Sequence, residues 1–216
     1  MTSIINHWIN GELQPSTSER YGDVFNPATG EVSASVSMGN SDDLEKAVES
    51  ASKAFETWSQ TSVTKRAQIF FKYKELLESN REELIDLITA EHGKVAADAA
   101  GSLQRGIEVV DFVCGIPHLL KGEFSEQVGT GIDCYSTRQP IGVCSGVTPF
   151  NFPAMVPMWM YPVSIACGNT FVLKPSEKDP SCVMKLANLF KEAGLPDGVF
   201  NIVNGDKDCL LYTSDA

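Results

Sequence analysis

The sequence of 216 residues lacks the segments that direct a protein into or across a membrane. No apolar run approaches the roughly 20 residues that a membrane-spanning helix needs. The first eight residues have neither the basic start nor the long apolar centre of a secretory signal, and they contain no arginine, which argues against a mitochondrial presequence. We therefore expect a protein of a bacterial-type cytoplasm that has no membrane partner.

Motifs for metal binding and redox chemistry are also missing. The six cysteines stand at irregular spacings and include no C-x-x-C pair. The three histidines, His7, His92 and His118, share no spacing typical of a metal site or a catalytic dyad. We expect reduced, mostly buried thiols, no metal, and no functional role for the histidines.

Basic residues are few and scattered. The 17 lysines and arginines are outnumbered by 28 acidic residues, and the formal net charge of −11 repels polyanions. Nucleic acid is therefore not expected as a partner. The apolar content of 43% is enough for a chain of this length to bury a sizeable core, which predicts a folded globular protein.

Short strands and then helices are predicted in the first eighty residues. Short apolar pieces alternate with turn signals over the first forty residues, and Asn10-Gly11 is typical of a tight hairpin turn, so two or three strands are expected. Apolar residues at helical spacing predict an amphipathic helix that begins after a Ser41 cap. A second helix is predicted over about 64–79.

Two further helices and an extended hairpin follow. Asn80 and Glu83 read as a capping box that opens a helix ending at Gly93. A longer helical pattern covers about 95–120, and Pro117 should break or kink its last turn. The alternating segment 122–140, bounded by glycine and proline, predicts a hairpin that leaves the helical body, and protruding hairpins often serve assembly.

The segment from Ile141 onward predicts a parallel α/β sheet. Three apolar runs, separated by two helical segments and joined by connections of a few residues, favour right-handed crossovers between parallel strands. The first helical segment is opened by Pro153 and the second is closed by Gly194. The expected buried strands have the sequences IGVCSGV, TFVLK and VFNIV.

Ligands of such sheets bind where the strands' carboxyl ends meet the following loops. Those ends here are residues 148–153, residues 174–178, and Asn204 with Gly205. The glycine fingerprint G-x-G-x-x-G is absent, so a standard dinucleotide phosphate loop is not predicted.

Four side chains could carry chemistry, and each has a plainer alternative. Asn151 could donate to a developing negative charge, or could merely cap the helix near Pro153. Lys174 and Glu177 could bind a ribose, or could be solvated charges. Arg105 could grip a carboxylate with its planar fork, or could be a solvated helix residue.

Two motifs decide between these alternatives by resemblance. TPFNFP at 148–153 and LKPSE at 173–177 look like paired signatures of the aldehyde dehydrogenase superfamily. Flanking sequence such as PIGVCSGVTPFNFPAMVPMWMYPVSIACGNTFVLKPSE and AGLPDGVFNIVNG resembles its coenzyme-A-acylating methylmalonate-semialdehyde branch, and the resemblance extends over about residues 5–208. It implies a Rossmann-like, doubly wound parallel sheet of the α/β class, with an amino-terminal helical region and a protruding oligomerisation hairpin.

The resemblance also implies an activity for a longer parent protein. Such enzymes oxidise methylmalonate or malonate semialdehyde with NAD, lose carbon dioxide, and transfer the acyl group to coenzyme A. A cysteine thiolate attacks the aldehyde, and the amide at the position of Asn151 donates to the oxygen that becomes negatively charged. Arg105 is matched to the substrate's carboxylate. The implied cofactor contacts are Thr148, Phe150, Lys174, Glu177 and Lys178, the last of which stands where this branch has arginine.

The resemblance divides the chain into parts. Residues 1–123 and 141–208 would belong to the NAD-binding domain, and residues 124–140 would form the oligomerisation hairpin. Residues 209–216 match no expected continuation and are interpreted as non-native. No cysteine stands in the context of the family nucleophile, so the catalytic domain is expected to be absent and the chain alone inactive. The full-length parent is expected to be a homodimer or homotetramer.

Two other functions stay open on the sequence alone. In a hydrolytic aldehyde dehydrogenase, water activated by a general-base carboxylate would take the thioester, and that position lies outside the chain. A non-catalytic module would instead bind a nucleotide or a partner and would use the hairpin for assembly.

Overall fold

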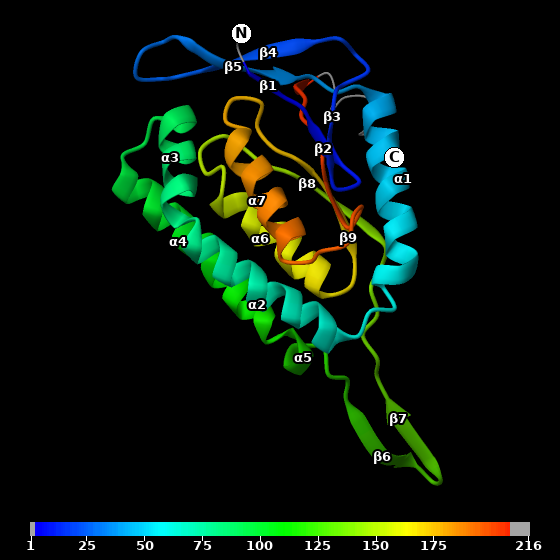
Figure 1. Cartoon of the computed structure of the whole chain (residues 1–216). Coiled ribbons are helices and arrows are strands. Elements are labelled where there is room, and N and C mark those ends of the chain that lie inside the picture. The colour runs from blue at the N-terminus through cyan, green and yellow to red at the C-terminus, as the bar shows by residue number, and fades with distance from the viewer. Residues whose placement is uncertain (1–2, 208–216) are drawn as a thin grey trace.

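The computed structural model describes residues 3–207, and its centre is a mixed five-stranded sheet of order β3-β2-β10-β9-β8 (Figure 1). Strands β8, β9 and β10 run parallel, as the sequence predicts. Strand β2 pairs antiparallel with β10, and β3 pairs antiparallel with β2. The strands are β2 (His7–Ile9), β3 (Glu12–Gln14), β8 (Val143–Val147), β9 (Thr170–Lys174) and β10 (Phe200–Ile202).

The amino-terminal region contains five strands, more than the two or three predicted. The predicted turn at Asn10 and Gly11, with φ angles of 55° and 74°, joins β2 to β3. Three other strands form a separate sheet of order β1-β5-β4. The number of strands was underestimated because β1, β2 and β3 contain only three residues each, too few to show a clear alternation. Their bounds are β1 (Ser3–Ile5), β4 (Tyr21–Phe25) and β5 (Val32–Ser37).

Helices cover both faces of the central sheet, so the predicted doubly wound arrangement is confirmed. Phe171 and Leu173 of β9 belong to the main core, which includes α6 (Met155–Ala166) and α7 (Ser181–Glu192). Val172, which points to the opposite face, packs with Ala47 and Ala51 of α1 (Ser41–Trp58). The two helix layers lie on either side of the strands in Figure 1.

Three further helices enclose α6 and α7 from outside: α2 (Val63–Ser79), α3 (Arg81–His92) and α4 (Ala96–Cys114). The layers meet at buried Tyr73 of α2, whose hydroxyl lies 2.6 Å from that of Tyr161. The Tyr73 ring also stacks on Phe190 of α7, with centroids 4.2 Å apart. The two buried hydroxyls therefore satisfy each other inside an apolar core.

Two predicted helix caps are wrong. Asn40, not Ser41, caps α1, because its side chain accepts from the Asp43 amide at 3.1 Å. The capping box predicted at Asn80 does not form, because its amide group donates to the Leu76 carbonyl at 2.9 Å. Asn80 thus satisfies the end of α2 and leaves no side-chain cap for α3.

The long helical pattern breaks earlier than predicted. Helix α4 ends at Cys114, Gly115 forms its C-cap, and α5 (Ile116–Leu119) follows as a separate turn. Pro117 lies at the start of α5, where a proline is tolerated because those amides have no helical partner.

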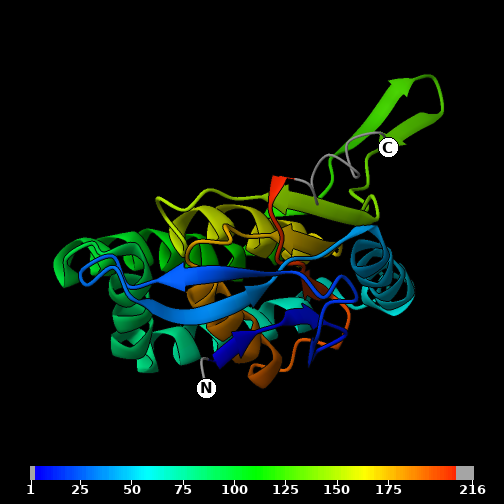
Figure 2. The ribbon, with the colours of Figure 1, turned by 90° about the horizontal axis from the view of Figure 1, so that it is seen from above.

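The predicted hairpin is present and projects away from the body of the protein (Figures 1 and 2). It consists of β6 (Phe124–Gly129) and β7 (Ile132–Tyr135), which pair antiparallel. Its large apolar side chains are exposed to solvent, namely Phe124, Val128, Ile132 and Tyr135.

Strand β8 is less buried than the sequence predicts. It lies at the edge of the central sheet, pairs with β9 on one side, and exposes 54% of Val147. Within residues 3–207, no helix is long and apolar enough to cross a membrane. The tail predicted to be non-native, residues 209–216, lies outside the described residues.

Candidate functional site

The loops that follow β8 and β9 lie side by side at the carboxyl end of the parallel strands. The ladder between the strands ends at the pair Val147 and Lys174, and the amide of buried Thr148 donates to the Lys174 carbonyl at 3.1 Å. This pairing holds the segments 148–153 and 174–178 against each other, as predicted from their positions at strand ends.

Asn151 lies in the loop between β8 and α6, and it does not cap the helix. The N-cap of α6 is Ala154, which makes no side-chain capping bond. The Asn151 side chain is exposed and makes no hydrogen bond to any residue in 3–207, whereas its carbonyl accepts from Lys94 Nζ at 2.9 Å. The alternative interpretation of Asn151 as a helix cap is therefore wrong, and its amide is available to a ligand.

Arg105 and Asn151 line one open pocket of about 470 Å³. Arg105 projects from α4 and is exposed, and no acidic side chain in the described part of the chain forms an ion pair with it. A guanidinium without a protein partner can bind a carboxylate through two parallel N–H bonds. The structure thus brings together two residues that are 46 positions apart in the sequence and that were predicted separately.

A second pocket, of about 410 Å³, contains three of the predicted cofactor contacts, Phe150, Glu177 and Lys178. Lys178 Nζ lies 4.6 Å from the centroid of the Phe150 ring, a cation–π contact. Glu177 also pairs with Lys174, with Nζ and Oε2 3.0 Å apart. Lys174 and Thr148 do not line this pocket, so the structure places the predicted cofactor residues in one region without bringing all of them to one surface.

His92 lines both pockets and Lys94 lines the pocket of Asn151, although the sequence indicated no role for either. The His92 ring stacks on Phe150 with centroids 6.3 Å apart. Burial lowers the pKa of His92, and the nearby Lys94 lowers it further. Only the fold reveals this position, because both residues come from the corner between α3 and α4.

Asp179 is another residue of this region that the sequence analysis did not identify. Its side chain is buried and lines the second pocket. Among residues 3–207, no group donates a hydrogen bond of normal geometry to either carboxylate oxygen. Burial raises the pKa of Asp179 to about 7, against the opposing effect of the nearby Ser176 hydroxyl. The charges of Glu91 and Glu177 raise this pKa further, and that of Lys94 lowers it.

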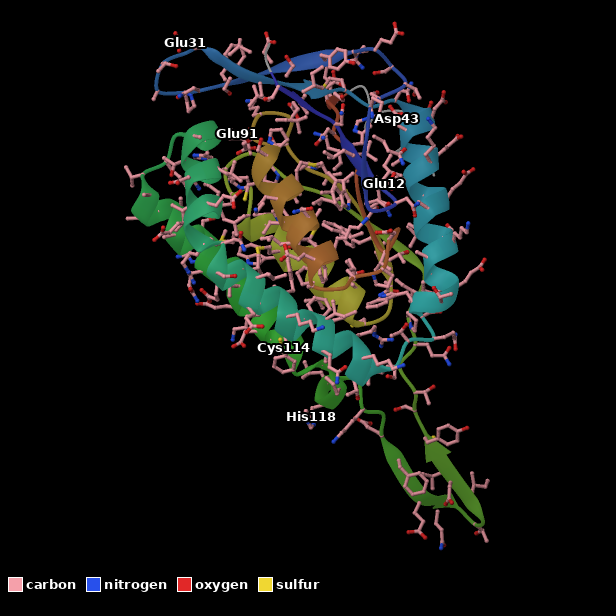
Figure 3. All side chains as sticks on the ribbon, in the orientation of Figure 1. Glu12, Glu31, Asp43, Glu91, Cys114 and His118 are labelled. Carbon is pink, nitrogen blue, oxygen red and sulfur yellow. The ribbon has the colours of Figure 1, made fainter. Side chains whose placement is uncertain are left out.

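Glu91 is a second carboxylate of this pocket, and it is partly buried. It lies near the end of α3 beside the start of α7 (Figure 3) and accepts from the Ser181 amide at 2.9 Å. A carboxylate at a helix amino terminus satisfies amides that have no helical partner. Burial nevertheless raises the pKa of Glu91.

The buried Asp179 should make stability depend on pH. The pKa of Asp179 is higher in the folded protein than in the unfolded chain, so its protonated form favours folding. This contribution to the free energy of unfolding is fully present below about pH 4 and is lost as the pH rises through about 7. We expect Asp179→Asn to raise the free energy of unfolding at pH 8.5 by about 2 kcal/mol, and by about half as much at pH 5.5. Urea unfolding at both pH values measures this difference. The exposed Asp86→Asn on α3 is the control, and equal gains at the two pH values would contradict the prediction.

Within the described part of the chain, this region contains neither a cluster of metal ligands nor a disulfide. Among residues 3–207, no group of three histidine, cysteine or acidic side chains is arranged to hold a metal ion. The cysteines in that range are free thiols, of which Cys114 and Cys182 are buried and Cys134, on the hairpin, is exposed.

Comparison with known proteins places this geometry in a family context. A model described as the aldehyde dehydrogenase family matches residues 13–211. A malonate-semialdehyde dehydrogenase of Pseudomonas aeruginosa is 53% identical over 206 residues, which make up 95% of this chain and 41% of that protein. The malonate-semialdehyde dehydrogenase 2 of Bacillus mycoides is 52% identical and is covered to 43%.

Similar solved structures also come from aldehyde dehydrogenases. The methylmalonate-semialdehyde dehydrogenase of Oceanimonas doudoroffii superimposes with a TM-score of 0.94 at 54% identity, over 97% of this chain and 43% of that one. An NAD-dependent aldehyde dehydrogenase of Sinorhizobium meliloti superimposes with a TM-score of 0.90 at 33% identity, over 96% and 42%. The chain therefore spans less than half the length of each of these relatives.

Proposed function

Because the chain belongs to the aldehyde dehydrogenase family, we propose that it is part of an NAD-dependent, coenzyme-A-acylating dehydrogenase of methylmalonate or malonate semialdehyde. The observation that carries this proposal is the shared pocket of Asn151 and Arg105. One side chain is a neutral donor and the other a carboxylate-binding cation, which suits an aldehyde that also bears a carboxylate. The names of relatives at 52 to 54% identity support the same substrate class.

The end of β9 suits the adenosine half of NAD. Lys174 can donate to ribose or phosphate oxygens, and the partly exposed Glu177 carboxylate can accept from paired ribose hydroxyls. Phe150 and Lys178 would contact the cofactor from the second pocket, and Thr148 would do so through its backbone. Bound NAD would supply the hydride acceptor, while the protein's contribution is to bind and orient it.

Asn151 would stabilise charge during attack on the aldehyde. In the family, a cysteine thiolate adds to the carbonyl carbon, and negative charge develops on the carbonyl oxygen. An amide N–H held in place beforehand meets charge that exists only in the transition state, and one such donor contributes about 3 kcal/mol. The amide suits this task because it donates without carrying a charge that would neutralise the thiolate.

Arg105 would hold the carboxylate end of the substrate and so orient the aldehyde toward Asn151. Its exposed guanidinium can form two parallel bonds to a carboxylate, which a lysine cannot match in geometry. The acyl group would then pass to coenzyme A with loss of carbon dioxide, giving propionyl-CoA or acetyl-CoA.

The parts of the chain would serve this enzyme in different ways. Residues 1–123 and 141–208 would belong to the NAD-binding domain, with the catalytic domain supplied by the rest of a longer cytoplasmic protein. The hairpin of residues 124–140 would hold together a homodimer or homotetramer, because its exposed apolar side chains offer a surface to a second copy. The uncovered edge of β8 would be paired within the full-length protein.

The acyl acceptor provides the decisive test. Full-length protein given methylmalonate semialdehyde, NAD and coenzyme A should form NADH and propionyl-CoA in equal amounts and release carbon dioxide. Chromatography of the products measures this ratio, and the 216-residue chain is the control that should form no NADH. Free acid as the product in the presence of coenzyme A would instead identify a hydrolytic enzyme.

A further inference from the structure

We propose that Lys94, in the corner between α3 and α4, is a positioning residue that fixes the backbone of Asn151. The proposal rests on the proposed function, because it concerns the placement of the amide that would meet the reacting oxygen. Lys94 would not touch the substrate in this role. It would act through the loop that carries Asn151.

The corner itself is held in a conformation that leaves it little freedom. Helix α3 ends at His92, and its C-cap is Gly93, whose φ of 82° lies in the left-handed region. A Cβ at this glycine would lie 2.7 Å from Cγ of Pro27, so close packing also excludes a side chain. Helix α4 begins two residues after Lys94, at Ala96. The Lys94 backbone is therefore fixed from both sides by regular structure.

Contacts from this corner reach consecutive residues of the Asn151 loop. Lys94 Nζ donates to the Asn151 carbonyl at 2.9 Å and lies 4.4 Å from the centroid of the Phe152 ring. His92 stacks on Phe150, at 6.3 Å between centroids. The aromatic residues on both sides of Asn151 and the carbonyl of Asn151 itself are thus in contact with one rigid corner.

This arrangement matters because the Asn151 side chain holds itself in place poorly. It makes no hydrogen bond to another residue in the described range, and the start of α6 has no side-chain cap that would secure the loop. A donor contributes to catalysis only when its position is set before charge develops. Misplacement of a reacting group by about 1 Å can cost about a hundredfold in rate. The bond from Lys94 supplies the missing constraint.

The test is a double-mutant cycle in the full-length protein, read by single-turnover thioester formation at saturating NAD. Lys94→Met keeps the stem over Phe152 but removes the charge and the hydrogen bond. It should slow acylation about thirtyfold while the Kd for NAD changes less than twofold. In the Asn151→Ala background, the same change should cost less than twofold, because the amide that it positions is gone. Lys53→Met, at an exposed site on α1, is the matched control and should leave acylation unchanged.

Two further measurements separate positioning from a general loss of structure. Hydrogen exchange of the peptide covering residues 148–153 should become faster in Lys94→Met but not in Lys53→Met. Lys94→Gln keeps an N–H donor and removes the charge. A double-mutant cycle of Lys94→Gln with Asn151→Ala does not depend on the folding of Lys94→Met. Lys94→Gln should retain more of the acylation rate than Lys94→Met.

The outcomes distinguish this proposal from the function on which it rests. The role of Lys94 would be overturned if the rate losses of the two single variants multiplied in the double variant, or if Lys94→Met left the acylation rate unchanged. Asn151 would remain a donor in both cases. If Asn151→Ala itself leaves acylation unchanged, the proposed function fails. The exchange rate of residues 148–153 would then still show whether Lys94 holds the loop.

Discussion

Replacement of Asn151 by alanine in the full-length protein should slow thioester formation by about a hundredfold or more and leave the Kd for NAD nearly unchanged. The physical reason is that the amide would bind charge that exists in the transition state and not in the ground state. Its exposed side chain makes no hydrogen bond to the described part of the chain, so little stability should be lost with it. Single-turnover kinetics with methylmalonate semialdehyde measure the acylation step directly.

Asn188→Ala provides the matched control for this prediction. Asn188 is also an exposed asparagine, but it lies on α7 away from both pockets. It should have wild-type acylation kinetics. If Asn151→Ala behaves like Asn188→Ala, the amide is a surface group and the oxyanion role is wrong.

Arg105→Leu should lower kcat/KM for methylmalonate semialdehyde by at least about thirtyfold, because losing one charge-assisted pair that substrate binding shields from solvent costs about 2 to 5 kcal/mol. Propanal has no carboxylate and should be affected far less. Steady-state kinetics with both aldehydes give the comparison within one protein. A loss of folding would lower both values together and be recognised in that way.

Arg105→Lys separates charge from geometry at the same position. Lysine keeps the positive charge but cannot form two parallel bonds to a carboxylate, so kcat/KM for the carboxylated aldehyde should fall between the values for arginine and leucine. Equal losses for the two aldehydes in Arg105→Leu would make Arg105 a plain helix residue. The assignment of a carboxylated substrate would then have no support from this site.

The elements predicted best from the sequence are the alternating strands and helices after Ile141. Strands β8, β9 and β10 and helices α6 and α7 lie where the apolar runs placed them, because turn signals separate each run from the next. The caps were less predictable. Asn40 and Ser41 are both good capping residues, and only the tertiary position of Asn40 decides between them. The break at Gly115 was missed because Pro117 gave the stronger local signal.

The residues of the candidate site also differ in whether a local sequence pattern points to them. The motifs at 148–153 and 173–177 made Asn151 and Glu177 candidates because both residues lie within short, distinctive segments. That Arg105 lines the pocket of Asn151 depends on how α4 packs against α6, which no local pattern encodes. Lys94 and Asp179 carried no signal either, since burial and contacts across the fold give them their properties.

The antiparallel addition of β2 to β10 has a consequence for the order of folding. Trp8 pairs with Ile202, and the amide of Asn10 donates to the side chain of Asn201 at 3.0 Å, a contact that spans 191 positions. On the ribosome, β2 and β3 have no sheet edge to join until β10 has emerged. Contacts of such long sequence separation form slowly, because the chain between them must be ordered first. The β2–β3 hairpin is therefore the first part of this sheet to be synthesised and among the last to join it.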